Sequence, residues 1–537
     1  MKTGKGTRVY KSPSDIVCVC NSTYCDTVAP IGDLQSNQAA LYVTSKSGKR
    51  LEKSILTFSE QFTQNANNLK TVDVRIVINT SRTFQHIVGF GGAFTDSAGI
   101  NLNRLSSAAR KNLMNSYFDK TGIQYTLGRV PMASTDFSTH AYSYCDKSGD
   151  FGLTTFNLTM EDFALKIPYI LEAEKLAGEM YLFASPWSAP GWMKTSGRMV
   201  GPGALLGAFN GQYYVTWANY FVRFFEEYYK QGIKFWGVTL ENEPSAGDLP
   251  GYKWQALFFS ARMMRKGVPE PHPWVGERLF CLCVRELGLF STAADLWGPT
   301  LKGSNITADL KLMVIDDQRY TLPDQADVIF ANPNASKYVD GIALHWYWDE
   351  YFNASILNDT HNRHPNKFIL ATEACNGYLS YDRGVSMGNW TRGELYGKDI
   401  IEDLQNWAVG WTDWNLCLDE GGGPNFVNNI VDAPIIVNNT VDEFYKQPMF
   451  YVLGHFSKFV RPCAVRLGMK IETNPLLDYS DLHGVVFRAL DEKIVVVLQN
   501  RHHTNSYGVF IPNPRNTSQT SNFLMESDSI ATVVWNN

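Results

Sequence analysis

The chain has 537 residues, of which 44% are hydrophobic and 13% aromatic, and its formal net charge is -5. A chain of this length and apolar content can bury a large core, so we expect one large domain with smaller additions. The mild negative charge provides no basic field for nucleic acid, and no apolar run reaches the roughly 18 residues that span a bilayer. We therefore expect a soluble globular protein.

The first residues, Met1 to Tyr10, are polar and basic and contain no apolar signal-peptide core, which by itself predicts a cytosolic protein. Ten Asn-x-Ser/Thr sequons point the other way, because composition alone would give roughly five. Among them we expect glycans at Asn21, Asn157 and Asn305.

Three cysteines lie close together at Cys18, Cys20 and Cys25, in a short segment typical of a loop. This spacing favours a Cys20–Cys25 disulfide formed in an oxidising compartment, with a metal site as the alternative. Cys18 then needs a partner, and no cysteine precedes it in the sequence. We therefore expect the mature N-terminus to differ from the one written here.

Residues 30–83 contain short alternating runs, such as Val72, Val74 and Ile76 between Asp73 and Arg75, which predict strands of a β-sandwich. From residue 84 onward, apolar runs alternate with longer amphipathic stretches. Eight such runs with helices between them indicate a parallel, closed (β/α)8 barrel. The expected strands are Ile87 to Phe94, Tyr125 to Met132, Met180 to Ser185, Phe235 to Leu240, Leu312 to Ile315, Gly341 to Tyr347, Phe368 to Thr372 and Val409 to Trp414.

Polar residues follow these strands at the end of the barrel where active sites lie. The fourth strand ends in Asn242-Glu243 before Pro244, and the seventh ends in Glu373. Pro244 stops further strand pairing because it has no N–H to donate. Two carboxylates therefore face one cavity, and Trp187, Trp346 and Trp414 lie at the ends of other strands around it.

Two such carboxylates are the groups that glycoside cleavage with retention requires. One carboxylic acid protonates the leaving oxygen, and a carboxylate roughly 5 Å away forms a glycosyl-enzyme intermediate. The nucleophile must be ionised, and Arg129 at the end of the second strand is the candidate cation. Flat aromatic rings suit the apolar faces of sugars, although each tryptophan taken alone is more often a core residue.

Several motifs also match a known family. They are Phe90 to Ala93, Arg129 to Asp136, Ser185 to Trp187, Glu241 to Gly247, Asp316 to Arg319, His345 to Tyr347, Thr412 to Asn415 and Tyr445 to Tyr451. Together they resemble the lysosomal glucosylceramidases of animals, in glycoside hydrolase family 30, from about Cys18 to nearly the C-terminus.

The resemblance implies a role for each matching residue. Glu243 would be the general acid/base and Glu373 the nucleophile, with Asn242 on the sugar 2-hydroxyl. The remaining positions would hold glucose (Asp136, Trp187, Trp414), form the rim (Tyr252, Trp254, Tyr347, Asn429) or support the nucleophile (Arg129, His345). No metal and no organic cofactor is implied.

The architecture and setting follow from the same resemblance. It implies a small β-sheet module with two disulfides (1–29 plus 416–447), a β-sandwich (30–83 plus 464–537) and the catalytic barrel (84–415 plus 448–463). It also implies glucosylceramide as substrate, a saposin-type activator, an anionic membrane surface and residence in the lysosomal lumen. Nucleic acid is not an expected partner.

The sequence departs from the family between strands four and five, where an atypical insert spans 262–294 and includes Cys281 and Cys283. We interpret this insert as a gene-model error, with a genuine lid over the cleft as the rival. Thr135 stands where relatives have a cysteine, and we expect little effect. The alternative functions are a catalytically silent glycolipid-binding or sugar-binding relative, or a family-30 hydrolase of other β-glucosides.

Overall fold

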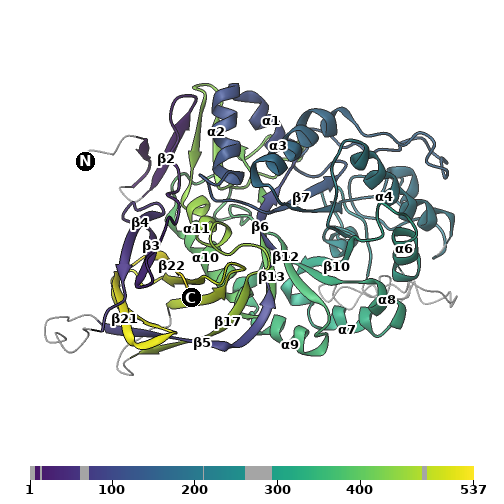
Figure 1. Ribbon diagram of the computed structural model, residues 1–537. Helices are drawn as coiled ribbons and strands as arrows, with labels where there is room; N and C mark the ends of the chain where they lie inside the picture. Colours follow the sequence, from purple (N-terminus) through teal and green to yellow (C-terminus); the bar gives the residue numbers. More distant parts are fainter. Residues whose placement is uncertain (1–5, 13–14, 61–71, 210, 261–292, 474–480) are drawn as a thin grey trace.

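The computed structural model describes residues 6–12, 15–60, 72–209, 211–260, 293–473 and 481–537 (Figure 1). The described strands form a closed eight-stranded barrel, a nine-stranded sheet and a five-stranded sheet. The predicted (β/α)8 barrel, accompanied by separate β-structure, is therefore confirmed.

The barrel contains the eight parallel strands that the sequence predicts, in sequential order, with the last strand pairing with the first. The first, second and last strands bury every residue, because helices cover the outside of the barrel and side chains fill the inside. The strands are β6 (Gly89–Ala93), β7 (Leu127–Met132), β8 (Tyr181–Pro186), β9 (Gly237–Thr239), β10 (Lys311–Gln318), β11 (Gly341–His345), β12 (Phe368–Glu373) and β13 (Ala408–Asn415).

Helices follow each barrel strand. The long helix after β8 buries Trp217, Phe221, Phe224 and Tyr228, a spacing that places all four on one face. The helices are α1 (Asp96–Arg104), α2 (Ser107–Phe118), a π-helix (Asp162–Lys166), α3 (Ile167–Ala177), α4 (Gln212–Lys230), α6 (Ala293–Lys302), α7 (Asp324–Phe330), α8 (Pro333–Tyr338), α9 (Ser355–Arg363), α10 (Trp390–Gln405) and α11 (Pro448–Ser457).

The nine-stranded sheet combines both ends of the chain, in the order β21-β20-β5-β17-β18-β19-β22-β3-β4. A bridge between Ser59 and Thr520 joins its two edges, so the sheet curves back around its own apolar core. In Figure 1 these purple and yellow strands lie together on one side of the barrel. They are β3 (Gln38–Ser45), β4 (Glu52–Thr57), β5 (Val72–His86), β17 (Val465–Thr473), β18 (Leu482–Arg488), β19 (Ile494–Asn500), β20 (Tyr507–Asn513), β21 (Asn516–Met525) and β22 (Ser529–Trp535).

The five-stranded sheet also joins distant segments, because β2 from the N-terminal region pairs with β16. Its strands are β1 (Thr7–Val9), β2 (Ile16–Asn21), β14 (Leu418–Asp419), β15 (Ile435–Asn438) and β16 (Glu443–Lys446). The predicted Cys20–Cys25 disulfide is present beside it, whereas Cys18 is a buried free thiol and forms no second disulfide among the described residues. On this topology we propose the three-part domain division given above.

Residues 262–292, which form most of the atypical insert and include Cys281 and Cys283, lie outside the described residues. Helix α6 begins at Ala293 and leads into β10. Within the described ranges, no helix is both long and apolar enough to cross a membrane.

Candidate active site

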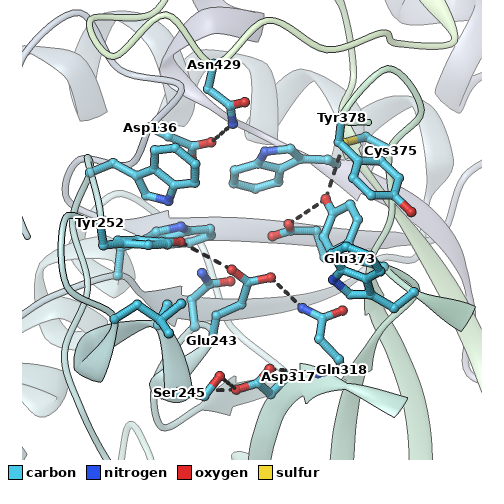
Figure 2. Close-up of a pocket in the computed structure, with 18 of the residues that line it drawn as sticks. Asp136, Glu243, Ser245, Tyr252, Asp317, Gln318, Glu373, Cys375, Tyr378 and Asn429 are labelled. Atoms are coloured by element: carbon cyan, nitrogen blue, oxygen red, sulfur yellow. Dashed lines mark hydrogen bonds between the residues drawn. The ribbon is translucent and has the colours of Figure 1, made fainter. Parts of the chain in front are cut away.

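A cavity of about 290 Å³ lies at the carboxyl ends of the barrel strands. Glu243 and Glu373 line it, and so do all eight residues expected to bind substrate: Asp136, Trp187, Asn242, Tyr252, Trp254, Tyr347, Trp414 and Asn429. Figure 2 shows the two glutamates between the Asp136–Asn429 pair on one side and the Ser245–Asp317 pair on the other. Arg129 and His345 are fully buried behind the cavity.

The backbone is strained where Glu243 enters the cavity. Glu243 has a φ of 42°, and in the neighbouring strand Ile315 and Asp316 have φ values of 80° and 50°. Non-glycine residues adopt this region at a cost of about 1–3 kcal/mol each and persist there only when their surroundings fix them. The two strained segments hold each other, because the Glu243 N–H donates to the Asp316 carbonyl at 2.9 Å.

The carboxylate of Glu243 has donors mainly on one oxygen. Oε1 accepts from Gln318 Nε2 at 2.7 Å and lies 3.1 Å from His345 Nδ1, whereas Oε2 has only the Tyr252 hydroxyl, at 3.4 Å. One oxygen each of Glu243 and Glu373 lie within 4.8 Å of each other. Retaining glycosidases hold their two carboxyl groups about 5–5.5 Å apart, and inverting enzymes about 6.5–9.5 Å apart.

Glu373 has a donor on each oxygen. Arg129 Nη1 donates to Oε2, and the Tyr347 hydroxyl donates to Oε1 at 2.8 Å. Burial raises the pKa of the Glu373 carboxyl, while the charges of His345 and Arg129 and the Tyr347 hydrogen bond oppose that rise. The two cations and the tyrosine therefore supply the stabilisation that an ionised nucleophile needs in a buried site.

Arg129 and His345 connect the two glutamates through buried Asp316. Arg129 Nη2 donates to Asp316 at 2.8 Å and to Asn242 Oδ1 at 2.9 Å, and His345 Nε2 lies 3.1 Å from Asp316. Burial alone would lower the pKa of His345, but the charge of Glu373 and the hydrogen bonds to Asp316 and Glu243 raise it to about 10. His345 is thus a buried imidazolium between the two acids.

Two stacked tryptophans line the cavity. Trp187 and Trp414 stack with ring centroids 5.0 Å apart. Beside them Asp136 Oδ2 accepts from Asn429 Nδ2 at 2.8 Å, while its buried Oδ1 has no protein partner. Burial and the nearby charge of Glu373 raise the pKa of Asp136 to about 7. Thr135, the family departure, accepts the Phe137 N–H at 2.9 Å and so shapes the turn that carries Asp136.

A buried lysine fixes the rim that carries Tyr252 and Trp254. Lys194 Nζ donates to the carbonyls of Met199, Gly201 and Ala256 at 2.9, 2.9 and 2.6 Å. Burial lowers the pKa of Lys194 to about 8. These three bonds join the loop after β8 to the segment that supplies the rim aromatics.

Sequence reasoning gave no role to several cavity residues. Gln318 contacts Glu243 directly, and Asp317 accepts from the Ser245 hydroxyl at 2.5 Å. The only signal for them was their place in the Asp316 to Arg319 and Glu241 to Gly247 motifs. A second, apolar pocket adjoins the cavity and shares Tyr320 and Trp348 with it; among the described residues Tyr351 and Phe352 also line it.

The predicted glycosylation positions lie outside this cavity. Asn157 and Asn305 are exposed, and Asn21 is half-buried with its side chain accepting from Thr23 and Tyr24.

The cluster of Glu243, His345 and Glu373 is poorly suited to a metal ion. These three residues are close enough to bind one metal ion together. A histidine must be neutral to bind a metal, however, and the neighbouring carboxylates keep His345 as a cation. Arg129 moreover already provides Glu373 with a positive partner.

Close paired carboxylates beside a flat aromatic wall, at the mouth of a (β/α)8 barrel, define a glycoside hydrolase. The model of the glycosyl hydrolase family 30 TIM-barrel domain matches residues 87–270 and 290–460, so the match breaks off inside the atypical insert. The chain belongs to glycosyl hydrolase family 30.

Relatives agree with this assignment. The Caenorhabditis elegans protein named "Putative glucosylceramidase 4" is 45% identical over 98% of this chain and 94% of its own length. The lysosomal acid glucosylceramidase of Mus musculus is 41% identical over 91% of this chain and 88% of its own length. The crystal structure of SrfJ from Salmonella typhimurium superimposes with a TM-score of 0.77 at 25% identity, over 93% of this chain and all of that one.

Proposed function

We propose that this protein is a retaining β-glucosidase that cleaves glucosylceramide to glucose and ceramide. The separation of Glu243 and Glu373, within 4.8 Å, is the observation that carries the retaining mechanism. The names of the relatives at 41% and 45% identity support the substrate.

In the first step Glu373 attacks the anomeric carbon while Glu243 gives its proton to the glycosidic oxygen. The C–O bond to ceramide breaks, ceramide leaves as an alcohol, and a glucosyl ester forms on Glu373. Glu243 carries its proton on Oε2, because Oε1 faces the donors of Gln318 and His345. Arg129 donates to Oδ1 of Asn242, so the NH₂ group of the Asn242 amide remains available to the sugar 2-hydroxyl.

In the second step Glu243, now ionised, takes a proton from water as the water attacks the anomeric carbon. The ester bond breaks, glucose leaves with its β configuration retained, and both carboxyl groups return to their starting states. Asp136 and the stacked Trp187 and Trp414 hold the glucose ring during both steps.

The apolar pocket beside the cavity supports a lipid aglycone. Trp348 and Tyr351 expose 50% and 64% of their surface at its edge, and Leu249, at the rim of the cavity, exposes 38%. Exposed apolar surface of this kind marks a lipid or partner contact. A membrane-bound substrate, an anionic lipid surface and a saposin-type activator fit this rim. Lysosomal residence fits the name of the Mus musculus relative, and glycans at Asn21, Asn157 and Asn305 would accompany it.

The aglycone is tested with Trp348→Ala and Tyr351→Ser against Tyr229→Ser, an exposed aromatic residue on the distant helix α4. We expect the first two variants to lose kcat/KM for glucosylceramide in mixed micelles about tenfold and to keep activity on a soluble aryl glucoside. Equal losses on both substrates would contradict the lipid role of this pocket.

The mechanism is tested by intact-protein mass after incubation with a 2-fluoroglucosyl inactivator. We expect one label per chain, absent in Glu373→Gln and slowed in Glu243→Gln. No label on folded wild-type protein would instead favour the catalytically silent binder. Labelling with no turnover of glucosylceramide, but turnover of a β-linked glucose disaccharide, would favour the second candidate, a hydrolase of other β-glucosides.

A further inference from the structure

A cluster of three potential metal ligands lies outside the cavity, where helix α10 packs against the nine-stranded sheet. It contains Glu394 on α10, His503 in the loop after β19, and Asp528 just before β22. One carboxylate oxygen of each acid and one ring nitrogen of His503 lie within 4.8 Å of one another. The geometry points to a site for a divalent transition-metal ion, with zinc as the best match.

The buried acids supply the independent observation that this cluster needs. Glu394 is 3% exposed, and its Oε1 accepts no hydrogen bond of normal geometry, although the Trp390 indole N–H lies near the carboxylate. A buried carboxylate oxygen left unpaired is costly, so this atom calls for a proton or a cation. The guanidinium of Arg501 lies farther away, with Nε 4.0 Å from Oε2.

Asp528 and His503 complete the open side of the cluster. Asp528 is 5% exposed, and its Oδ1 lies 2.7 Å from His503 Nδ1 while Lys46 holds Oδ2 at 3.3 Å. The side chain of His503 is 71% exposed, so an ion can enter from solvent and the imidazole can adjust over it.

The donor set selects the metal. One imidazole and two carboxylates are typical ligands of Zn²⁺, at about 2.0–2.2 Å, with a water in the fourth position. A tetrahedral ion places its ligand atoms about 3.4 Å apart, so the three groups need shifts of about 1 Å or less to reach it. Two other described clusters are already held together in another way: Arg319 forms ion pairs with all three carboxylates of the Asp349–Asp399–Asp403 cluster, and a disulfide joins Cys20 to Cys25.

The bound ion would link helix α10 to the nine-stranded sheet. Glu394 belongs to the barrel, whereas His503 and Asp528 belong to the sheet, so the bound metal would link the two through three bonds. Binding to the folded state alone raises its stability by mass action.

The test is titration of the full, metal-free chain with Zn²⁺, followed by calorimetry and by thermal unfolding, and with Co²⁺, followed by visible absorption. We expect one site per chain, a higher Tm with Zn²⁺, and the absorption of a tetrahedral cobalt site. His503→Ala should weaken binding by at least about tenfold. Because His503 is exposed, this variant should fold normally.

Two further variants make the assignment specific. His140→Ala removes another exposed histidine, one beside Glu161, and should leave zinc affinity unchanged. Glu394→Gln should lose the cobalt spectrum. Two results would overturn the site. One is zinc binding that survives His503→Ala, which includes binding at the catalytic cluster alone. The other is the absence of any binding below millimolar zinc.

Discussion

Gln318 is the side chain that most directly controls the proposed acid/base. Its amide donates to Glu243 Oε1 at 2.7 Å, and this bond holds the carboxyl group in place at the cavity. We predict that Gln318→Leu lowers kcat about tenfold, because Glu243 loses the donor that positions it for both proton transfers. The measurement is steady-state kcat and KM on a soluble aryl glucoside.

The kinetic constants separate this role from a structural one. A lower Tm with an unchanged kcat would show that Gln318 only supports the fold. Rescue of kcat by Gln318→Asn is not expected, because the shorter side chain cannot reach Oε1.

At the residue level, the sequence predicted the site residues that lie at or just after the ends of barrel strands. It missed residues such as Gln318, whose direction depends on a local distortion of the backbone. Glu373 ends β12 and Glu243 follows β9 by four residues, so barrel geometry places both at the same end of the barrel. Gln318 follows a register shift between Ile315 and Asp317, beyond which simple alternation no longer says which way a side chain points. Strain of this kind depends on packing around the site and leaves no periodic signal.

At the scale of elements, the rim loops depend on one buried lysine. Lys194 holds three backbone carbonyls and is only 1% exposed. We predict that Lys194→Met destabilises the protein by about 3 kcal/mol, because at least one or two carbonyls stay buried without a donor. KM should rise as Tyr252 and Trp254 lose their support. Denaturant unfolding and steady-state kinetics provide the two measurements.

Lys302→Met is the matched control for this prediction. Lys302 also donates to two carbonyls, those of Ala308 and Leu310, but at the surface, where water can replace it. Its loss should cost less than about 1 kcal/mol. Equal effects of the two variants would contradict a special role for Lys194.

The elements themselves were largely predictable, because eight buried apolar runs separated by helices leave few arrangements other than a barrel. Strand bounds differ where polar residues continue a strand. The run expected to end at Ile315 extends as β10 to Gln318, since the buried barrel mouth accommodates Asp316 and Asp317. The fourth strand is shorter than predicted, Gly237–Thr239, because the chain turns toward the site before Glu243.

At the scale of the whole molecule, periodicity could not predict how the chain ends combine. In the nine-stranded sheet β5 lies between β20 and β17, and β22 lies between β19 and β3. Such pairings join residues hundreds of positions apart and are fixed by side-chain packing across the sheet. The expectation of two mixed-end modules therefore came from family resemblance alone.

Stability of the whole molecule should fall as pH rises. Burial and neighbouring charge raise the pKa of Asp136 to about 7 and that of Asp317 to about 6, and contacts with three carboxylates raise that of His345 to about 10. All three values exceed those of an unfolded chain, so at these groups the folded state binds more protons between about pH 4 and 10, and buried His455, with its pKa lowered to about 3, offsets this only in part. The contribution of these groups to the stability of the folded state is fully present at acid pH, below their unfolded-state pKa values. It is lost as pH rises through each folded-state pKa.

We therefore predict a Tm several degrees higher at pH 5 than at pH 8, measured by scanning calorimetry at one scan rate. Each unit of pKa shift corresponds to about 1.4 kcal/mol, so the buried Asp136 alone contributes a few kcal/mol at most. Asp136→Asn cannot ionise and should flatten the decline, whereas exposed Asp309→Asn should reproduce the wild-type slope. A Tm that rises from pH 5 to pH 8 would mean that the buried carboxyls are ionised throughout, and Asp136 would then bind glucose as a carboxylate rather than as an acid.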